Sequence, residues 1–356
     1  MKDKVCFVSL GNLYLVPYIK KYISIIRCDY DIVFWNRHNI DEHCGENEQF
    51  RYDYHISENV SKFKKLVGYF GFSRFASNII KKNKYSLIIL LCTSAGMLLR
   101  STLLKHYSGR FILDIRDYTL EKNKVFYAFE KSLVNNSKLN VISSAGYKKF
   151  LPPGKYITAH NELDIPYNTV EKFRKKNRNT DNGKIILTNI GLIRFHSQNK
   201  KIIDTFGNDT RFELRFIGEG ASQLSGYCQE KNIKNVVIHN RFSPEETFDF
   251  LWETDCILNL YGNNTPLLDY ALSNKLYYSA KLGLPILVCP NTYMEEISVT
   301  NGFGFAVDLG DHNSKEALWK YYHRINWNEL YLKCDEFLNK VNEEQKIFET
   351  HVVDSL

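Results

Sequence analysis

The sequence repeats one pattern through most of its length: a short apolar run, a turn, and a segment in which apolar residues have helical spacing. The apolar runs of strand length fall into two groups, at 5–10, 31–35, 86–92, 110–115 and 139–143, and at 184–191, 212–218, 235–240, 255–261, 285–289 and 304–308. Strands that alternate with helices form parallel sheets covered by helices on both faces. The pattern therefore predicts an α/β chain with two Rossmann-like domains.

The length of the chain agrees with two domains, because 356 residues exceed what a single core usually supports. A polar stretch at 164–183 has almost no core-forming pattern and is the predicted linker. We expect an N-terminal domain at 1–168, a second domain at 169–318, and C-terminal helices at 319–356. The aromatic stripes of these last helices indicate that they either cap the second domain or cross back to the first.

The composition favours a cytoplasmic chain. Eight cysteines without a CxxC pair are typical of a reducing compartment. The apolar run at the N-terminus is too brief for a signal peptide. The longest run, 87–99, is interrupted by polar residues and is too short to span a bilayer. We therefore expect no transmembrane helix.

The segment SNKLYYSAKLGLPILV, at 273–288, carries the first candidate for chemistry. Ser273 or Asn274 is a suitable N-cap, a short helix follows, and Gly283 is a suitable C-cap before a buried strand. Lys275 falls in the first helical turn, where the helix dipole disfavours a cation by a few tenths of a kcal/mol. An anion bound at this helix terminus would remove the conflict. The alternative is an ordinary solvated surface lysine.

Loops that follow strands hold further candidates, because ligands of parallel sheets bind beyond the carboxyl ends of the strands. Arg194 follows the strand that ends at Gly191, and a guanidinium there can grip two phosphate oxygens, although a structural salt bridge is the alternative. Gly218-Glu219-Gly220 and, in the first domain, Gly11-Asn12 are either ligand-approach loops or tight turns. The cleft between two such domains is the default site.

The first domain contains two groups of acidic residues that are candidates for a site. Asp114, Arg116 and Asp117 end a strand, where they either orient an acceptor hydroxyl or form a self-satisfied ion network. The pair Asp29 and Asp31 precedes a strand, at the wrong edge for a metal site, and no other cluster has metal-ligand spacing, so we expect no metal.

Residues 59–113 contain ten Lys and Arg and no acid, and within them 61–84 is a basic amphipathic segment. Its apolar residues Phe63, Leu66, Val67 and Phe70 have helical spacing. Such a helix can lie on an anionic membrane, or it can turn its stripe to the core. A nucleic-acid partner is not expected, because no recognised binding motif accompanies the charge.

A set of motifs occurs in a characteristic order along the chain. The motifs of the second half, between Ile185 and Asp308, are NIGLIRF, LRFIGEG, DCILNLYGNN, ALSNKLYYSAKLGLPILV, NTYMEEI and GFGFAVD; those of the first half are ILDIRDYT, VISSAGYKKFLP and the HN of 160–161. Together they resemble bacterial glycosyltransferases of the GT-B fold, close to the retaining family 4 group of capsule, exopolysaccharide and O-antigen assembly. The resemblance implies two Rossmann-like domains whose parallel sheets face a central cleft.

The resemblance also implies roles for residues. The donor, a nucleotide-sugar, binds mainly to the second domain, and Arg194 and Lys275 contact its diphosphate and stabilise the leaving group. The implied donor set is Gly191, Arg194, Gly218, Gly220, Tyr261, Asn274, Lys275, Tyr278 and Glu296. The implied acceptor set is Gly11, Asn12, Asp114, Arg116 and Asp117, and the implied catalytic residues are Arg194, Lys275, Arg116 and Asp117.

Two positions depart from the family pattern. Tyr278 stands where the family commonly has the carboxylate that holds the donor ribose, and it would act by hydroxyl bonding or base stacking. Arg116 stands where a histidine is often found. A retaining enzyme of this fold needs no protein nucleophile, because the donor phosphate can accept the proton of the incoming hydroxyl.

The expected function is transfer of a sugar from a nucleotide-sugar, a UDP-sugar before a GDP-sugar, to a polyprenyl-diphosphate-linked saccharide, without a metal cofactor. The expected location is the inner face of the cell membrane, with 61–84 on the lipid surface. The alternatives are a sugar-nucleotide epimerase of the same scaffold and a non-catalytic partner subunit, which the departures at Tyr278 and Arg116 make plausible.

Overall fold

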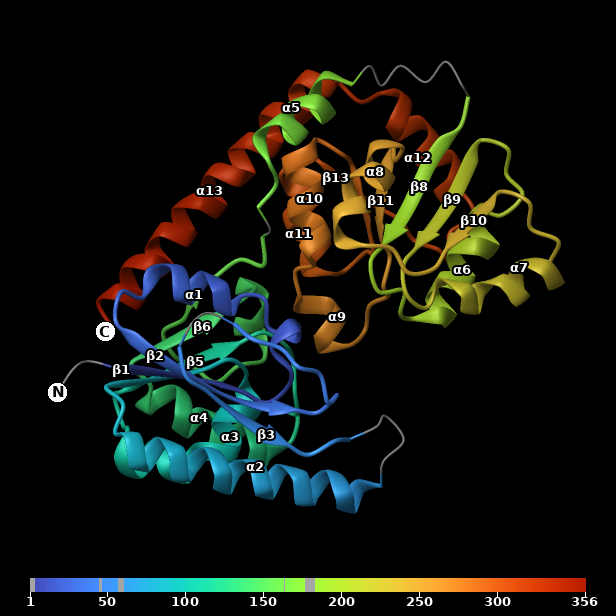
Figure 1. The fold of residues 1–356 in the computed structure, drawn as a ribbon. Coiled ribbons are helices and arrows are strands. Elements are labelled where there is room, and N and C mark those ends of the chain that lie inside the picture. Colours follow the sequence, from blue (N-terminus) through green and yellow to red (C-terminus); the bar gives the residue numbers. More distant parts are fainter. Residues whose placement is uncertain (1–3, 45–46, 57–60, 163, 177–182) are drawn as a thin grey trace. The chain divides into compact units, whose positions relative to one another are not determined.

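A computed structural model describes residues 4–44, 47–56, 61–162, 164–176 and 183–356. The chain divides into two compact units, the first comprising Met1–His160 with Glu343–Leu356 and the second comprising Asn161–Asn342. Each unit contains one parallel sheet (Figure 1). In the described part of the chain, no helix combines the length and the apolar character that crossing a membrane requires.

The sheet of the first unit has seven parallel strands in the order β3-β2-β1-β4-β5-β6-β7. Their bounds are β1 (Lys4–Ser9), β2 (Asp29–Asn36), β3 (Gln49–Asp53), β4 (Leu87–Leu90), β5 (Phe111–Ile115), β6 (Leu139–Ile142) and β7 (Ile157–Thr158). All five strands predicted in the first half are confirmed. The two edge strands β3 and β7 were not predicted, because β3 is polar and partly exposed and β7 has only two residues.

Helices cover both faces of this sheet (Figure 1). One face carries α2 (Lys62–Asn83), α3 (Thr93–His106) and α4 (Lys124–Asn136), and the other carries α1 (Ile19–Ile25). The final helix, α13 (Trp327–Val353), contributes its last turns to the first unit, where Phe348 is fully buried with its ring 5.1 Å from that of Tyr22. Of the two expectations for the C-terminal helices, crossing back to the first domain is confirmed.

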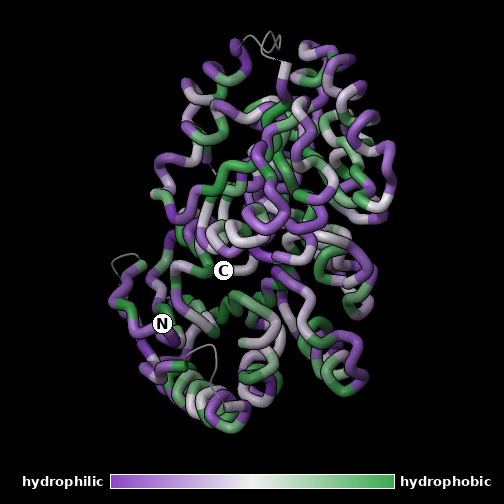
Figure 2. Tube along the Cα trace, turned by 90° about the vertical axis from the view of Figure 1, so that its right-hand side faces the viewer, coloured by the Kyte–Doolittle hydropathy of each residue, from purple (hydrophilic) through white to green (hydrophobic). Residues whose placement is uncertain are grey.

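The sheet of the second unit has six parallel strands in the order β10-β9-β8-β11-β12-β13. Their bounds are β8 (Ile185–Ile190), β9 (Phe212–Ile217), β10 (Val236–His239), β11 (Cys256–Asn259), β12 (Ile286–Val288) and β13 (Gly304–Ala306). Its helices are α5 (Tyr167–Lys175), α6 (His196–Phe206), α7 (Ser225–Glu230), α8 (Thr247–Trp252), α9 (Pro266–Tyr270), α10 (Asn274–Leu282), α11 (Tyr293–Thr300) and α12 (Ser314–His323). All six predicted strands are confirmed. Hydrophobic residues gather in the interior strands (Figure 2).

The interpretation of 164–183 as a linker is wrong for its first half, while 177–182 lies outside the described residues. Helix α5 occupies Tyr167–Lys175 and belongs to the second unit. Its Phe173 is buried with its ring edge against Trp252, at 5.3 Å between ring centroids. A single buried aromatic is too weak a periodic signal to identify the helix from the sequence.

Helix α2 buries a different face from the stripe noted in the sequence. Gly68, Phe72, Ala76 and Ile80 face the core at a spacing of four residues. The apolar stripe itself, Phe63, Leu66, Val67 and Phe70, is 44–74% exposed. The expectation that this stripe turns to the core is therefore wrong.

Candidate active site

Two glycine loops meet at the carboxyl edge of the second sheet, one after β8 and one after β9. Gly191, Gly218 and Gly220 all have positive φ, at 106°, 136° and 93°. A Cβ at Gly218 would lie 1.7 Å from the Gly191 carbonyl oxygen, and one at Gly220 would lie 2.5 Å from the Ile193 carbonyl oxygen. Only glycine fits, so the packing of the two loops on each other explains these residues. Their contact with a donor stays a prediction.

Lys275 lies at the start of α10, whose N-cap is Ser273, with the hydroxyl accepting a hydrogen bond from the Lys275 amide. The side chain of Lys275 is turned inward, and the residue is only 4% exposed. Its Nζ donates to Asn189 Oδ1 at 2.7 Å and to the Tyr261 hydroxyl at 2.5 Å, and it lies 4.6 Å from the centroid of the Tyr261 ring. The interpretation of Lys275 as a solvated surface lysine is excluded.

The charge of Lys275 is poorly compensated within the protein. Both of its hydrogen-bond partners are neutral, and no carboxylate in the described ranges forms an ion pair with it. Burial of an unpaired ammonium is costly, and the amides at the start of α10 add to that cost. A bound anion would offset both terms, so Lys275 is suited to hold a phosphate group.

A chain of hydrogen bonds connects Lys275 to the loop of Arg194. Asn189, at the end of β8, donates from Nδ2 to Asn199 Oδ1 at 3.3 Å, and Asn199 donates from Nδ2 to the Arg194 carbonyl oxygen at 2.7 Å. The Arg194 side chain is exposed and has no ion pair among the described residues. Lys275 and the main chain of Arg194, the two predicted phosphate-binding residues, are thus joined by the hydrogen bonds of Asn189 and Asn199.

Asn189, Asn199 and Phe195 are positioning residues that the sequence interpretation missed. An asparagine inside the apolar run ILTNIG was the available signal for Asn189. Phe195 adopts the left-handed conformation, with φ 58° and ψ 51°, and its ring centroid lies 5.3 Å from that of Tyr261. Bulky residues rarely accept this conformation, and such strain is concentrated at functional sites.

The other predicted donor residues lie apart from this hydrogen-bond chain. Asn274 and Glu296 are exposed, in the first turns of α10 and α11. Tyr278 is half-buried, one turn after Lys275, with its ring 6.2 Å from that of Phe248, and burial raises the pKa of its hydroxyl. In the described part of the chain, no hydrogen bond joins these three to Lys275.

A pocket of about 780 Å³ opens at the carboxyl ends of β11, β12 and β13. Its lining includes Gln198 and Lys201 of α6, Asn263 after β11, Cys289 after β12, and 307–312 after β13. Its volume is in the range of small-molecule sites. None of the predicted donor residues lines it.

In the first unit, Asp114 and Arg116 form a buried ion pair at the end of β5. Arg116 Nε and Nη2 contact the two Asp114 oxygens at 2.5 and 2.7 Å, and Nη1 donates to the Ala159 carbonyl oxygen. Tyr22 donates to Asp114 at 2.7 Å, and the Tyr18 ring covers the guanidinium at 4.2 Å. Burial alone would lower the pKa of Arg116, but the Asp114 carboxylate raises it above its ordinary value. Of the two interpretations of this cluster, a self-satisfied ion network is the one that describes Asp114 and Arg116.

The acceptor roles of Asp114 and Arg116 stay predictions. The ion pair does not support them, because it already engages both side chains. Asp117, the third member of the cluster, lies in the loop that follows β5 and is exposed. It is therefore the member of the cluster that a ligand reaches most easily.

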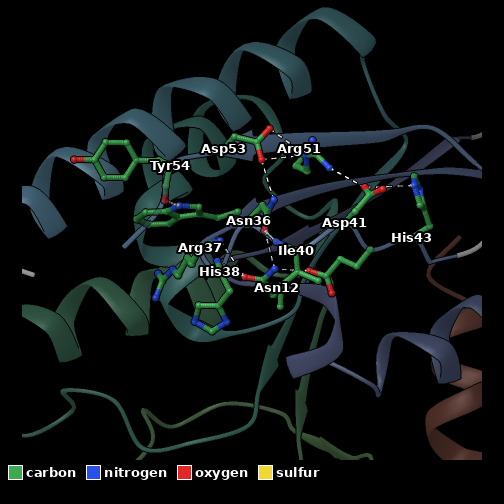
Figure 3. Close-up of polar contacts among 12 residues, drawn as sticks. Asn12, Asn36, Arg37, His38, Ile40, Asp41, His43, Arg51, Asp53 and Tyr54 are labelled. Atoms are coloured by element: carbon green, nitrogen blue, oxygen red, sulfur yellow. Dashed lines mark hydrogen bonds and ion pairs between the residues drawn. The ribbon is translucent and has the colours of Figure 1, made fainter. Parts of the chain in front are cut away.

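Asn12, the predicted acceptor residue after β1, connects two loops (Figure 3). Its Nδ2 donates to Asn36 Oδ1 and to Glu42, and its Oδ1 accepts from the amides of Arg37 and His38. All four hydrogen-bonding positions of the amide are used, and Asn12 is fully buried. Asn12 therefore positions its neighbours. A Cβ at Gly11 beside it would lie 3.8 Å from Leu15 Cδ1, an ordinary van der Waals contact, and Gly11 stays a predicted acceptor contact.

Within the described residues, no group of three or more His, Cys, Asp or Glu is arranged to hold a metal ion. Asp29 and Asp31, which were expected to precede a strand, lie within β2. Asp31 pairs with Lys4 at 2.7 Å and accepts from Tyr85 at 2.6 Å. These two contacts give Asp31 a structural role.

Known proteins match this chain at the level of structure. No protein-family model and no curated protein sequence matches it. A sucrose-phosphate synthase from Thermosynechococcus elongatus is 11% identical with a TM-score of 0.70, and the match covers 99% of this chain and 97% of that one.

The lipopolysaccharide outer core galactosyltransferase WaaB, in its apo form, is 14% identical with a TM-score of 0.68, and the match covers 99% of this chain and all of that one. Anabaena HepE in complex with UDP-glucose is 10% identical with a TM-score of 0.67, over 99% of this chain and all of that one. At such identities the likeness establishes the fold alone. Two parallel-sheet domains that match these structures over nearly the whole chain give the protein the GT-B fold of glycosyltransferases.

Proposed function

We propose that the protein is a glycosyltransferase that moves a sugar from a nucleotide-sugar to a lipid-linked saccharide, with retention, in the assembly of a surface polysaccharide. The observation that carries the proposal is Lys275, a buried and unpaired cation at a helix N-terminus in the second unit. A UDP-sugar is the first donor to test, because the HepE structure is a complex with UDP-glucose, and a GDP-sugar is the next.

Departure of a nucleoside diphosphate builds negative charge on the phosphate oxygens, and fixed cations stabilise that charge most in the transition state. Lys275 is preorganised for this role by Asn189 and Tyr261, so it needs no reorganisation during the reaction. Arg194 adds a forked guanidinium from the neighbouring loop. Tyr278, one turn further along α10, replaces the usual carboxylate at the ribose, through its hydroxyl or its ring.

Retention follows if the donor phosphate itself accepts the proton of the acceptor hydroxyl. The bond between the anomeric carbon and the phosphate oxygen then breaks, and the acceptor oxygen forms its bond on the same face. Protein groups hold the diphosphate and need not form a covalent intermediate. The anomeric configuration of the product, measured by NMR, tests this part of the proposal.

We also propose that α2 rests on an anionic membrane, which gives the protein a peripheral position on the inner face of the cell membrane. Two observations support this position. Phe63 and Phe70 are 74% and 72% exposed, and Lys62, Lys64 and Lys65 flank them without an acid in the helix. Exposed aromatic residues among lysines favour insertion into the headgroup region of anionic lipids. A lipid-linked acceptor would be presented at that surface.

A thermal-shift panel of UDP-, GDP-, CMP- and dTDP-sugars tests donor binding, because a ligand that binds only the folded state raises the melting temperature. The donor that binds is then incubated with and without lipid extract from a membrane. Transfer of labelled sugar into the lipid fraction is the expected result. Conversion of the donor without lipid would identify an epimerase, and no shift with any donor would favour a non-catalytic subunit.

A further inference from the structure

Arg37 is held in a fixed position at the ligand-binding edge of the first unit, directly after β2. Its guanidinium carbon lies 4.2 Å from the ring centroid of Trp35 and 5.3 Å from that of Tyr69 on α2. Its main chain is fixed as well, because its amide donates to Asn12 and its carbonyl oxygen accepts from the amide of Ile56. The rings of Trp35 and Tyr69 therefore hold the Arg37 guanidinium in place and leave it little freedom to reorient.

Three acids of the neighbouring loop and strand, Asp41, Glu42 and Asp53, form contacts with other residues (Figure 3). Glu42 accepts from the amides of Leu13 and Tyr14, and Asp41 and Asp53 both pair with Arg51. In the described ranges, no hydrogen bond or ion pair engages the Arg37 side chain, and its buried Nε has no partner. Arg37 is thus an uncompensated cation at an edge where parallel sheets bind ligands.

The surroundings of Arg37 favour an anion that carries an apolar chain. Helix α2, which supplies Tyr69, bears the exposed stripe of Leu66 and Phe70 on the same turns. An anionic headgroup at Arg37 would leave its apolar chain beside α2.

We propose that Arg37 binds the diphosphate of the lipid-linked acceptor, with Trp35 and Tyr69 fixing the guanidinium for bidentate contact with phosphate oxygens. This inference rests on the proposed function, because the acceptor is the substrate that joins a diphosphate to a lipid. It assigns the acceptor site to the end of β2 instead of the Asp114–Arg116 pair, whose charges neutralise each other.

The test measures binding of farnesyl diphosphate, farnesol and inorganic pyrophosphate to the full chain by calorimetry, without any donor. The variant is Arg37→Gln, and the matched control is Arg110→Gln. Arg110 is another arginine stacked on an aromatic ring, 4.8 Å from Tyr107, but at the opposite edge of the same sheet. We expect Arg37→Gln to weaken farnesyl diphosphate binding tenfold or more, as for loss of a charge-assisted contact, and Arg110→Gln to change it less than twofold. Farnesol binding should not differ between the variants.

Further measurements separate the possible failures. UDP is proposed to bind to the second unit, so its affinity should be unchanged in Arg37→Gln. Unchanged UDP binding would also show that this variant is folded. Arg37→Lys, which keeps the charge without the fork, should recover part of the affinity. Equal farnesyl diphosphate binding by Arg37→Gln and wild type would overturn the inference and leave the transferase proposal standing. If the variant instead loses binding only to phosphatidylglycerol vesicles, the phosphate belongs to a membrane headgroup, and the acceptor assignment is wrong.

Discussion

Three titratable residues in this protein lie where burial makes a charge expensive, and the surroundings of each differ. Lys275 keeps an unpaired ammonium between Asn189 and Tyr261. Arg116 is neutralised by Asp114. Glu130 of α4 is fully buried, and neither of its oxygens has a partner among the described residues. These surroundings give the three residues distinct experimental signatures.

Lys275→Met is expected to lower turnover on the order of a hundredfold or more, because it removes a fixed cation from the developing charge of the leaving group. The measurement is the initial rate with the donor found by thermal shift. Lys281→Met, at the other end of α10, is the control and should keep a rate within a few-fold of wild type. Near-normal rates for Lys275→Met would contradict the assignment of Lys275 to the diphosphate.

Glu130 is expected to make the first unit less stable as the pH rises. Burial, with a smaller contribution from Glu121, raises its pKa to about 8, above the usual value of 4.5. A raised pKa means that the stabilising form is the protonated one, so its contribution is complete below about pH 4.5 and is lost as the pH rises through 8. Glu130→Gln removes this dependence, so its advantage over wild type should grow by a few kcal/mol between pH 5 and pH 8.

Hydrogen exchange of amides in β5 and β6 measures this effect for the first unit alone. Glu171→Gln, which changes a partly exposed acid of α5 that pairs with Lys175 in the second unit, serves as the control and should show no trend with pH. A difference between Glu130→Gln and wild type that stays constant from pH 5 to pH 8 would show that the carboxyl is not protonated at neutral pH.

Helices α2 and α4 pack one face against the core and leave large apolar side chains exposed on the other. Helix α2 packs Phe72, Ala76 and Ile80 against the sheet and leaves Phe63 and Phe70 outward. Helix α4 follows the same principle, with Leu133 buried and Val125 and Phe129 61% and 44% exposed. Helices α2 and α4 cover the same face of the sheet, so these exposed side chains lie on one side of the first unit (Figure 1).

The double variant Phe63→Ser/Phe70→Ser should lose most of its binding to phosphatidylglycerol vesicles without a change in melting temperature, since both side chains are already in water. Co-sedimentation at low and high salt measures the binding. Phe72→Ala, one turn away on the buried face, should behave in the opposite way, with vesicle binding retained and about 3–5 kcal/mol of stability lost. Equal vesicle binding by the double variant and wild type would exclude α2 as the lipid contact.

At the scale of the whole molecule, the two ends of the chain complete the same unit. The last turns of α13, from Glu343 onward, belong with the N-terminal sheet. Phe348 and Val352 are fully buried there, and a Glu344 carboxylate oxygen accepts a hydrogen bond from Nε2 of His160 at 2.9 Å. The hydrogen bond with His160 lowers the pKa of Glu344. The first unit therefore depends on residues from Glu343 onward, which are more than 180 positions away from His160 in the sequence.

Phe348→Ala should destabilise the first unit by about 3–5 kcal/mol, as for loss of a buried aromatic residue. Hydrogen exchange in the full chain should show faster opening of β1 and α1, with the amides of β8 and β11 unchanged. Ile347→Ala, at a neighbouring position that is 48% exposed, is the matched control and should leave both units as they are. Faster exchange throughout both units would mean that they unfold as one body.

The sequence by itself determined the parts of this protein that depend on local pattern. Strands that are apolar along their whole length, such as β4 and β12, are fixed by the burial of both faces, and all eleven predicted strands are present. The capping residues of α10 were also predicted from the local sequence, and the structure has Ser273 at the N-cap and Gly283, with φ 65°, at the C-cap. A local rule also identified Lys275 as anomalous, because its charge opposes the helix dipole.

Only the tertiary structure decided which partners the polar side chains meet. Nothing in the spacing of Lys275 and Asn189, which are 86 residues apart, reveals their hydrogen bond. The same holds for the pairing of Arg116 with Ala159 and for the aromatic faces around Arg37. The choice of buried face on α2 was also undetermined, because two apolar stripes compete on that helix and only contact with the sheet selects one. Burial and long-range contact depend on the packed chain as a whole, and a pattern confined to neighbouring residues cannot contain them.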